Sequence, residues 1–218
     1  RTSSEPDDLL TLLIQANMST DILEDQQLTT RSSHVNISLT FCVFRRRLTR
    51  RPGMQRKLRV ELLQVATDSP TMDELNALPY LDTVVRETMR RHPPVPAMAH
   101  QAFVDDAIPV DTPYKDRYGR VRDHIEIKKD DLVVLPIISL NRRKEIWGED
   151  AHEFKPECWE HIPKVAASVP GVWGNLLTFM GGPRACTGYR FALVETKALL
   201  FVLVHAFEFK LAIPAENI

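Results

Sequence analysis

Residues 179–188 read Phe-Met-Gly-Gly-Pro-Arg-Ala-Cys-Thr-Gly and directly precede the last long apolar stretch of the chain. Gly182 and Gly188, four positions before and two positions after Cys186, allow the backbone to turn tightly around the sulfur. Gly188 lies where a helix begins, and the first amides of a helix lack an internal partner and can face a thiolate. Arg184 adds a fixed positive charge with a planar fork. This setting favours the thiolate form of Cys186, and a thiolate is a metal ligand.

A lone cysteine in a glycine-rich loop has a second interpretation, which is a buried structural thiol. Spacing alone supports the two interpretations of Cys186 equally. Zinc is poorly supported, because zinc takes four ligands and no second cysteine lies nearby. His152, Cys158 and His161 cluster in the sequence but lack a recognised ligand spacing.

The composition of the chain restricts its class. Its 218 residues suffice for one ordinary domain or two small ones. Apolar residues make up 44% and charged residues 26%, which excludes collagen-like, fully disordered and coiled-coil chains. The 28 Lys and Arg nearly balance the 29 Asp and Glu, so no nucleic-acid partner is expected. Three cysteines without a Cys-x-x-Cys pair argue against a disulfide scaffold, and no apolar run has the roughly 20 residues of a membrane-spanning helix.

Apolar periodicity and helix-end signals predict a mainly α fold with a small antiparallel β-sheet. Pro52 opens one helical pattern, and Pro93-Pro94 ends another. The apolar positions from Val35 to Val43 alternate as in a strand, and three arginines follow them. The expected helices are 7–16, 52–66, 78–91 and 189–207; short strands lie within 95–135, an irregular stretch spans 139–177, and a strand-like segment follows at 208–213.

Three motifs in order carry a resemblance to a known family. The loop fits Phe-x-x-Gly-x-Arg-x-Cys-x-Gly over 179–188, and Glu87-Thr-Met-Arg90 and the segment 154–159 precede it. Together they resemble the C-terminal portion of a cytochrome P450 of the eukaryotic microsomal type. The resemblance covers about 52–213 and implies part of that fold: helices J and K, the meander, the haem-thiolate loop and helix L. It divides the chain into an atypical segment at 1–50, similar to the approach to helices H and I, and a haem-thiolate portion at 51–218.

The resemblance implies roles for individual residues. Cys186 would be the axial thiolate of haem b, whose electron donation favours O–O cleavage. Arg184 would pair with a haem propionate, and Phe179 would pack beside the sulfur. His100 stands where the family often places a second propionate ligand, although an ordinary histidine is equally supported. The implied cofactor-binding set is Phe179, Gly182, Arg184, Cys186, Gly188 and His100, with Cys186 as the metal ligand. Glu87 and Arg90 would form a buried structural pair, and 94–99 would line the substrate side.

Two departures from the family pattern stand out. An arginine of the meander normally completes the Glu87–Arg90 pair, and Cys158 occupies its position. We therefore expect Glu87 to lack hydrogen bonds unless Arg142, Arg143 or Lys155 compensates. The second departure is the oxygen-activation segment, which needs glycine within about 30–50. No glycine precedes Gly53, so this motif is absent from the chain.

The resemblance implies a haem-thiolate monooxygenase that hydroxylates a C–H bond of a small apolar substrate with O2. Electrons would come from NADPH through an NADPH–cytochrome reductase. The expected setting is the cytoplasmic face of the endoplasmic reticulum membrane, reached through segments absent from this chain. Six basic residues either form a docking face for the reductase or are ordinary solvated charges: Arg142, Arg143, Lys144, Lys155, Arg190 and Lys197. A catalytically inactive haem-binding or interaction fragment is the alternative, and a chain that does not fold stably is the third possibility.

Overall fold

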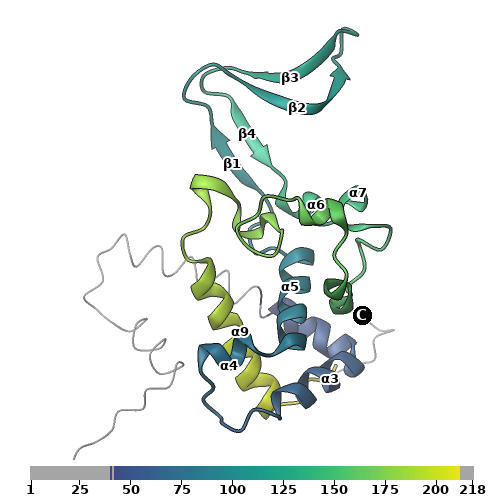
Figure 1. Cartoon of the computed structure of the whole chain (residues 1–218), viewed down its shortest axis with the longest axis vertical. Coiled ribbons are helices and arrows are strands. Elements are labelled where there is room, and N and C mark those ends of the chain that lie inside the picture. Colours follow the sequence, from purple (N-terminus) through teal and green to yellow (C-terminus); the bar gives the residue numbers. More distant parts are fainter. Residues whose placement is uncertain (1–39, 41, 212–218) are drawn as a thin grey trace, which may run out of the picture.

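The computed structural model describes residues 40 and 42–211, which form a helical body and a projecting β arm (Figure 1). The longer helices are α3 (Pro52–Leu62), α4 (Met72–Asn76), α5 (Pro79–Arg91) and α9 (Tyr189–Ala206). The strands are β1 (Met98–Gln101), β2 (Asp106–Lys115), β3 (Val121–Ile127) and β4 (Leu132–Leu135). Short turns of helix fill 137–184: α6 (Ile137–Leu140), α7 (Lys144–Trp147), η1 (Pro156–Glu160), α8 (Lys164–Ala167), η2 (Leu177–Phe179) and η3 (Gly182–Arg184). The expected fold class, mainly α with a small antiparallel sheet, is confirmed.

The two helices that flank the site follow the sequence closely. α5 begins at Pro79 and is capped by His92 immediately before Pro93, while α9 starts after Gly188. Proline fits the first turn of a helix because its fixed φ suits that position and no amide is needed there. α3 is shorter than the expected 52–66 and ends at Leu62. α4 was not predicted, although Thr71 and Glu74 form a reciprocal capping box at its start.

The prediction of a strand between Val35 and Val43 is wrong for the part of this segment that the structure describes. Residue 40 and residues 42–50 are helical. Phe44 and Leu48 are both fully buried, and their spacing of four places them on one face of this helix. The alternation in the sequence therefore did not reflect a strand. The expected helix 7–16 and the remainder of the alternating segment lie outside the described residues.

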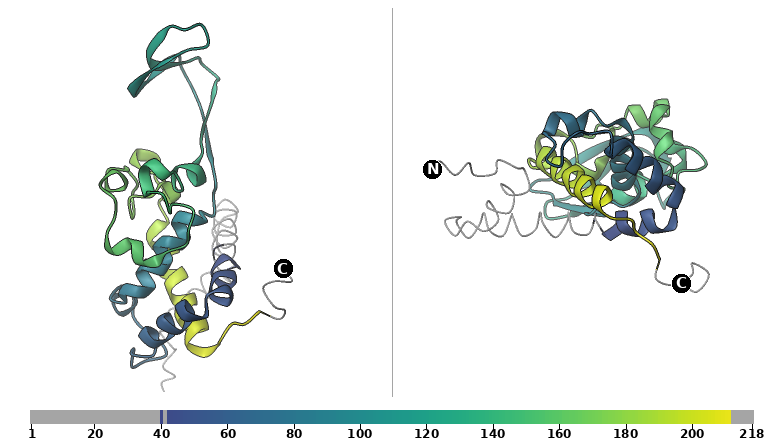
Figure 2. Two further views of the ribbon diagram at one scale, coloured as in Figure 1. Left: turned by 90° about the vertical axis from the view of Figure 1, so that its right-hand side faces the viewer. Right: turned by 90° about the horizontal axis from the view of Figure 1, so that it is seen from below.

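The β arm consists of two antiparallel ladders. β1 pairs with β4 in the register Met98↔Leu135 to Gln101↔Leu132, and β2 pairs with β3 with an irregularity between Pro109 and Tyr114. Figure 2 shows the second ladder at the far end of the arm, away from the helices. The arm joins the body through β1 and β4, so these two strands are the ones close to the rest of the fold.

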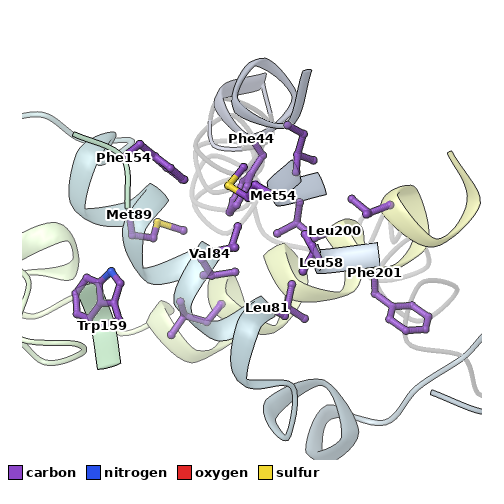
Figure 3. Packing of buried hydrophobic residues seen from close by; sticks show 14 of the residues in the cluster. Phe44, Met54, Leu58, Leu81, Val84, Met89, Phe154, Trp159, Leu200 and Phe201 are labelled. Carbon is purple, nitrogen blue, oxygen red and sulfur yellow. The ribbon is translucent and has the colours of Figure 1, made fainter. Parts of the chain in front are cut away.

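The hydrophobic core lies among α3, α5, α9 and the helix at 42–50 (Figure 3). Leu58, Leu81, Val84 and Phe201 are among its side chains that are at most 1% exposed. Each such side chain contributes roughly 1.5–3 kcal/mol through burial. This core fixes α5 against α9, and these two helices flank the cysteine loop.

The expected strand at 208–213 is wrong for 208–211, which have no regular structure. The side chain of Gln55 takes the place of a neighbouring strand here. Its Nε2 donates to the Phe209 carbonyl oxygen at 3.0 Å, and its Oε1 accepts from the Phe209 amide at 2.7 Å. A buried side-chain amide thus satisfies the backbone that a strand would otherwise pair.

Candidate functional site

The cysteine loop packs tightly against the segment that precedes it. The Cys186 amide donates to the Phe179 carbonyl oxygen at 2.9 Å, and the Val172 amide donates to the Met180 carbonyl oxygen at 2.9 Å. A Cβ on Gly181 would lie 1.8 Å from the carbonyl oxygen of Pro170, so only glycine fits this position. Gly182 has a φ of +68°, which glycine adopts without strain.

The thiol of Cys186 is exposed, and it lines a cavity of about 380 Å³. The wall is predominantly apolar. Most of it comes from the loop, the start of α9 and the segment after α5, and single residues of α5, α6 and the helix that precedes α3 complete it. Its members are Thr40, Met89, Pro94, Val95, Met98, Ile137, Thr178, Phe179, Met180, Arg184, Cys186, Thr187, Gly188, Phe191 and Ala192. The interpretation of Cys186 as a buried structural cysteine is therefore wrong. An exposed sulfur on an apolar wall is available to a ligand.

The structure gathers most of the expected site residues at this cavity. Phe179, Arg184 and Gly188 join Cys186 on its wall, whereas Gly182 forms the turn behind it without lining it. His100 is half-buried on β1 opposite Val133 and lies outside the lining. Three residues of the expected substrate-side segment 94–99 do line the cavity: Pro94, Val95 and Met98. Sequence reasoning missed the contributions of Ile137 and Phe191, because neither lies in a recognisable motif.

Aromatic and cationic side chains connect the loop to α5. Phe179 meets Trp173 edge-on at 6.0 Å between ring centroids, and the ring centroid of Tyr189 lies 6.2 Å from that of Phe179. The guanidinium of Arg86 lies 5.2 Å from the ring of Trp173 and 5.7 Å from that of Trp159. Such contacts contribute about 0.5–1.5 kcal/mol each and have preferred geometries. They hold the loop in position relative to α5.

Glu87 and Arg90 form a fully buried ion pair on α5. Arg90 donates from Nε and Nη2 to the two carboxylate oxygens of Glu87, both at 2.8 Å. Arg90 also donates to the carbonyl oxygens of Asn141, Ala151 and Glu153 at 2.8–3.1 Å. Both side chains are at most 3% exposed. Helix α5 is thereby joined to the segment at 141–153, as expected for a structural pair.

The expected shortage of hydrogen bonds at Glu87 is wrong. The backbone amide of Lys155 donates to Oε1 at 2.8 Å, and the indole Nε1 of Trp159 donates to Oε2 at 3.1 Å. The Cys158 thiol adds a weak contact at 3.8 Å. Compensation thus comes from a main-chain amide of Lys155 and from an indole, rather than from another arginine. Burial and the Glu87 charge raise the pKa of Cys158 to about 12, so this thiol stays protonated.

Comparisons with known proteins agree with this geometry. The family model for cytochrome P450 matches residues 4–216. The chain belongs to the cytochrome P450 family. It is 51% identical over 224 residues to cytochrome P450 monooxygenase 205 of Postia placenta, covering 97% of this chain and 41% of that protein. It is 36% identical over 226 residues to ganoderic acid synthetase CYP5150L8 of Ganoderma lucidum. That match covers 95% of this chain and 41% of the Ganoderma protein. The chain thus spans about 41% of the length of these relatives.

Cytochrome P450 proteins carry a haem iron, and the cavity at Cys186 fits such a group. A thiol is a soft ligand for iron. The apolar wall suits the flat face of a porphyrin, and the exposed guanidinium of Arg184 suits a carboxylate. No group of three or more His, Cys, Asp or Glu that could hold a separate metal ion occurs in the residues that the structure describes.

The sequence offered six basic residues as a docking face for the reductase. In the structure one of them is buried, and three others are paired with carboxylates. Lys197 is buried and pairs with Asp82 at 2.9 Å, so it cannot meet a partner. Three more have a carboxylate within 4 Å: Arg143 with Glu145, Lys144 with Glu149, and Lys155 with Asp150 and Glu153. The interpretation as ordinary solvated charges therefore accounts for these three side chains.

Proposed function

We propose that this chain supplies the thiolate-ligated haem site of a monooxygenase that hydroxylates a C–H bond of a small apolar substrate. The observation that carries the proposal is the exposed Cys186 thiol on the wall of an apolar cavity of about 380 Å³. The relatives named as monooxygenases support the same reaction class. When bound, a haem iron with a thiolate ligand supplies the reductive cleavage of O2.

The chain's own residues would bind and orient the group. Cys186 would supply the thiolate, and α9 begins directly after Gly188, so its first amides, which have no internal partner, are available to moderate the basicity of the sulfur. Arg184 pairs with a propionate, because its guanidinium is planar and always charged. Phe179 has ring contacts with both Trp173 and Tyr189, and these contacts hold its ring on the wall that it shares with Cys186. His100, two positions along β1 from Met98, faces the same side of that strand and receives a second propionate.

The substrate side is formed by side chains that exclude water. Pro94, Val95, Met98 and Ile137 offer no hydrogen-bonding side-chain groups, so an apolar molecule loses little by leaving water here. This favours a small apolar substrate.

Electrons come from NADPH through an NADPH–cytochrome reductase, at the cytoplasmic face of the endoplasmic reticulum; family membership supports both. None of the helices at 42–211 is long and apolar enough to cross a membrane.

The test is spectral. The chain is reconstituted with haem, reduced and exposed to carbon monoxide, and we expect the red-shifted Soret band of a thiolate-ligated iron. Cys186→Ser should remove this band, whereas the matched control Cys42→Ser, an exposed cysteine outside the cavity, should retain it. Absence of the band in the unmodified chain contradicts the proposal.

A specific observation favours a second candidate, a haem-binding chain without turnover. No glycine precedes Gly53, so the oxygen-activation segment of the family has no counterpart within 30–50. Turnover of an apolar substrate with reductase and NADPH separates the two candidates. The thiolate band with no product identifies the binding fragment, and product formation identifies the enzyme.

A further inference from the structure

His92 lies between two guanidinium groups at the end of α5. Nη2 of Arg47 is 2.7 Å from its Nε2, and Nη2 of Arg142 is 3.4 Å from its Nδ1. Arg142 also donates from Nε and Nη2 to the carbonyl oxygen of Arg91. Three segments thus meet here: the helix at 42–50, the C-terminus of α5, and the turn after α6.

This arrangement leaves a hydrogen bond unmade. Burial and the charges of Arg47 and Arg142 lower the pKa of His92 to about 4, so the ring is neutral near pH 7. A neutral imidazole has one acceptor nitrogen, and a guanidinium only donates. The shorter contact makes Nε2 the acceptor for Arg47. Nδ1 then carries the proton, and this N–H faces the N–H groups of Arg142.

Arg91 adds a second unsatisfied donor. Its side chain is 8% exposed, and its Nε is buried without a hydrogen-bond partner in the described part of the chain. Nη1 makes one long contact, 3.5 Å, to the carbonyl oxygen of Ala151. A buried donor of a charged group that lacks an acceptor destabilises the fold, because the group has lost its water without replacement. A hydrogen-bond acceptor at the Nε of Arg91 would therefore be stabilising.

The charges around His92 are also unbalanced. Within 42–211, no carboxylate oxygen lies within 4 Å of the guanidinium of Arg47, Arg91 or Arg142. Glu87, the carboxylate that acts on Arg91, is already bound by Arg90. Burial and the neighbouring cations Arg142 and Arg90 lower the pKa of Arg91 to about 10. Like charges accumulate here without a counter-ion.

A cavity of about 430 Å³ adjoins this cluster at Arg142. Arg142 lines it together with Ile138, Ser139, Arg143, Lys144, Glu145 and His152. Arg143 and Lys144 have glutamate partners at 3.0 and 2.7 Å, which leaves Arg142 as the guanidinium on this wall without one among the described residues. His152 follows Ala151, the residue that Arg91 contacts, so the cavity and the buried arginine share one stretch of backbone.

We propose that Arg142, Arg91 and the Nδ1–H of His92 bind a phosphate-type oxyanion that enters through this cavity. Such an anion accepts the hydrogen bonds that these donors leave unmade and balances their charge. A phosphate group, inorganic or on a lipid headgroup, offers several acceptor oxygens to these donors, whereas a halide is a single acceptor. The lining of this cavity shares no residue with that of the Cys186 cavity.

The experiment titrates inorganic phosphate into the 218-residue chain at constant ionic strength, with chloride as the balancing anion. Binding is measured by calorimetry and by the ring 15N resonances of His92. We expect saturable binding and a shift of the Nδ1 resonance. Arg142→Gln should weaken the affinity by about tenfold or more, the usual loss for one charge-assisted hydrogen bond. The matched control Arg143→Gln removes the same charge from the same cavity and should leave the affinity nearly unchanged.

If the glutamine variant fails to fold, Arg142→Lys replaces it in the experiment. This variant keeps the charge but loses the planar fork of the guanidinium, so it should also weaken phosphate binding. Vesicles of phosphatidylcholine with and without phosphatidic acid then identify the source. Arg142-dependent binding to the acidic vesicles indicates a lipid headgroup, and binding of inorganic phosphate alone indicates a free anion. No saturable phosphate binding, or equal losses in Arg142→Gln and Arg143→Gln, overturns the proposal.

Discussion

Arg90 and Arg91 are consecutive residues of α5, both nearly buried, yet their surroundings are opposite. Arg90 meets the Glu87 carboxylate and three carbonyl oxygens, and Glu87 in turn receives two more donors from the segment 155–159. Arg91 has an unpartnered Nε and lies beside the cations Arg142 and Arg47. The comparison teaches that burial alone does not make an arginine structural. A saturated pair stabilises the fold, whereas an unsaturated cluster is suited to a ligand.

The largest expected effect comes from breaking the saturated pair. Glu87→Gln removes the carboxylate and leaves Arg90 as a buried charge without its counter-ion, which typically costs about 3–5 kcal/mol. Urea unfolding should show this loss in the free energy of unfolding. Glu153→Gln removes an exposed carboxylate near the same segment and should cost under about 1 kcal/mol. Equal effects of the two substitutions would refute the importance of the pair.

A smaller loss should follow when one donor to Glu87 is removed. Trp159→Phe deletes the indole N–H that lies 3.1 Å from Glu87 and should cost about 1–3 kcal/mol. Trp147 is the matched control, because its rings lie 5.4 Å from those of Trp159 while its own Nε1 is buried without a partner in the described residues. Trp147→Phe should therefore destabilise less in thermal unfolding. The reverse order would contradict this account of Glu87.

The unsaturated cluster should respond to acid. The pKa of His92 is about 4 in the folded state, below its ordinary 6.5, so the unfolded state binds more protons between these values. The resulting stability is present above pH 6.5 and is lost as the pH falls towards 4. His92→Gln should flatten the dependence of the unfolding free energy on pH in this window. His124→Gln, on the exposed surface of β3, should leave it in place.

The smallest effect should come from Cys158. Its thiol lies 3.8 Å from Glu87, which has four shorter hydrogen bonds from other donors. Cys158→Ala should therefore change the unfolding free energy by less than about 1.5 kcal/mol. Differential scanning calorimetry provides the measurement. A loss as large as that of Glu87→Gln would show that the thiol, and not the indole and the Lys155 amide, maintains the pair.

Local sequence signals predicted the elements that depend on local geometry. Pro52 begins α3, Pro93 follows the end of α5, and Gly188 precedes α9, because proline and glycine act on their own backbone. The same local signals failed at 42–50, where the alternation up to Val43 suggested a strand but Phe44 and Leu48 pack on the core as a helix face. They failed again at Phe209, whose backbone partner is the side chain of Gln55, 154 positions away.

By itself, the sequence determined the turn around Cys186, because glycines within a few positions of the sulfur permit a tight turn. The spacing of Glu87 and Arg90 allowed a pair on one helix face, and the family resemblance implied that this pair is buried and structural. Only the tertiary structure decided that Lys155 and Trp159 complete Glu87 and that Cys186 opens on an apolar cavity. It also decided that the Nε of Arg91 is buried without an acceptor among the described residues. The physical reason is desolvation. Whether a polar group is satisfied depends on which distant segments exclude water from it, and that is fixed only when the chain packs.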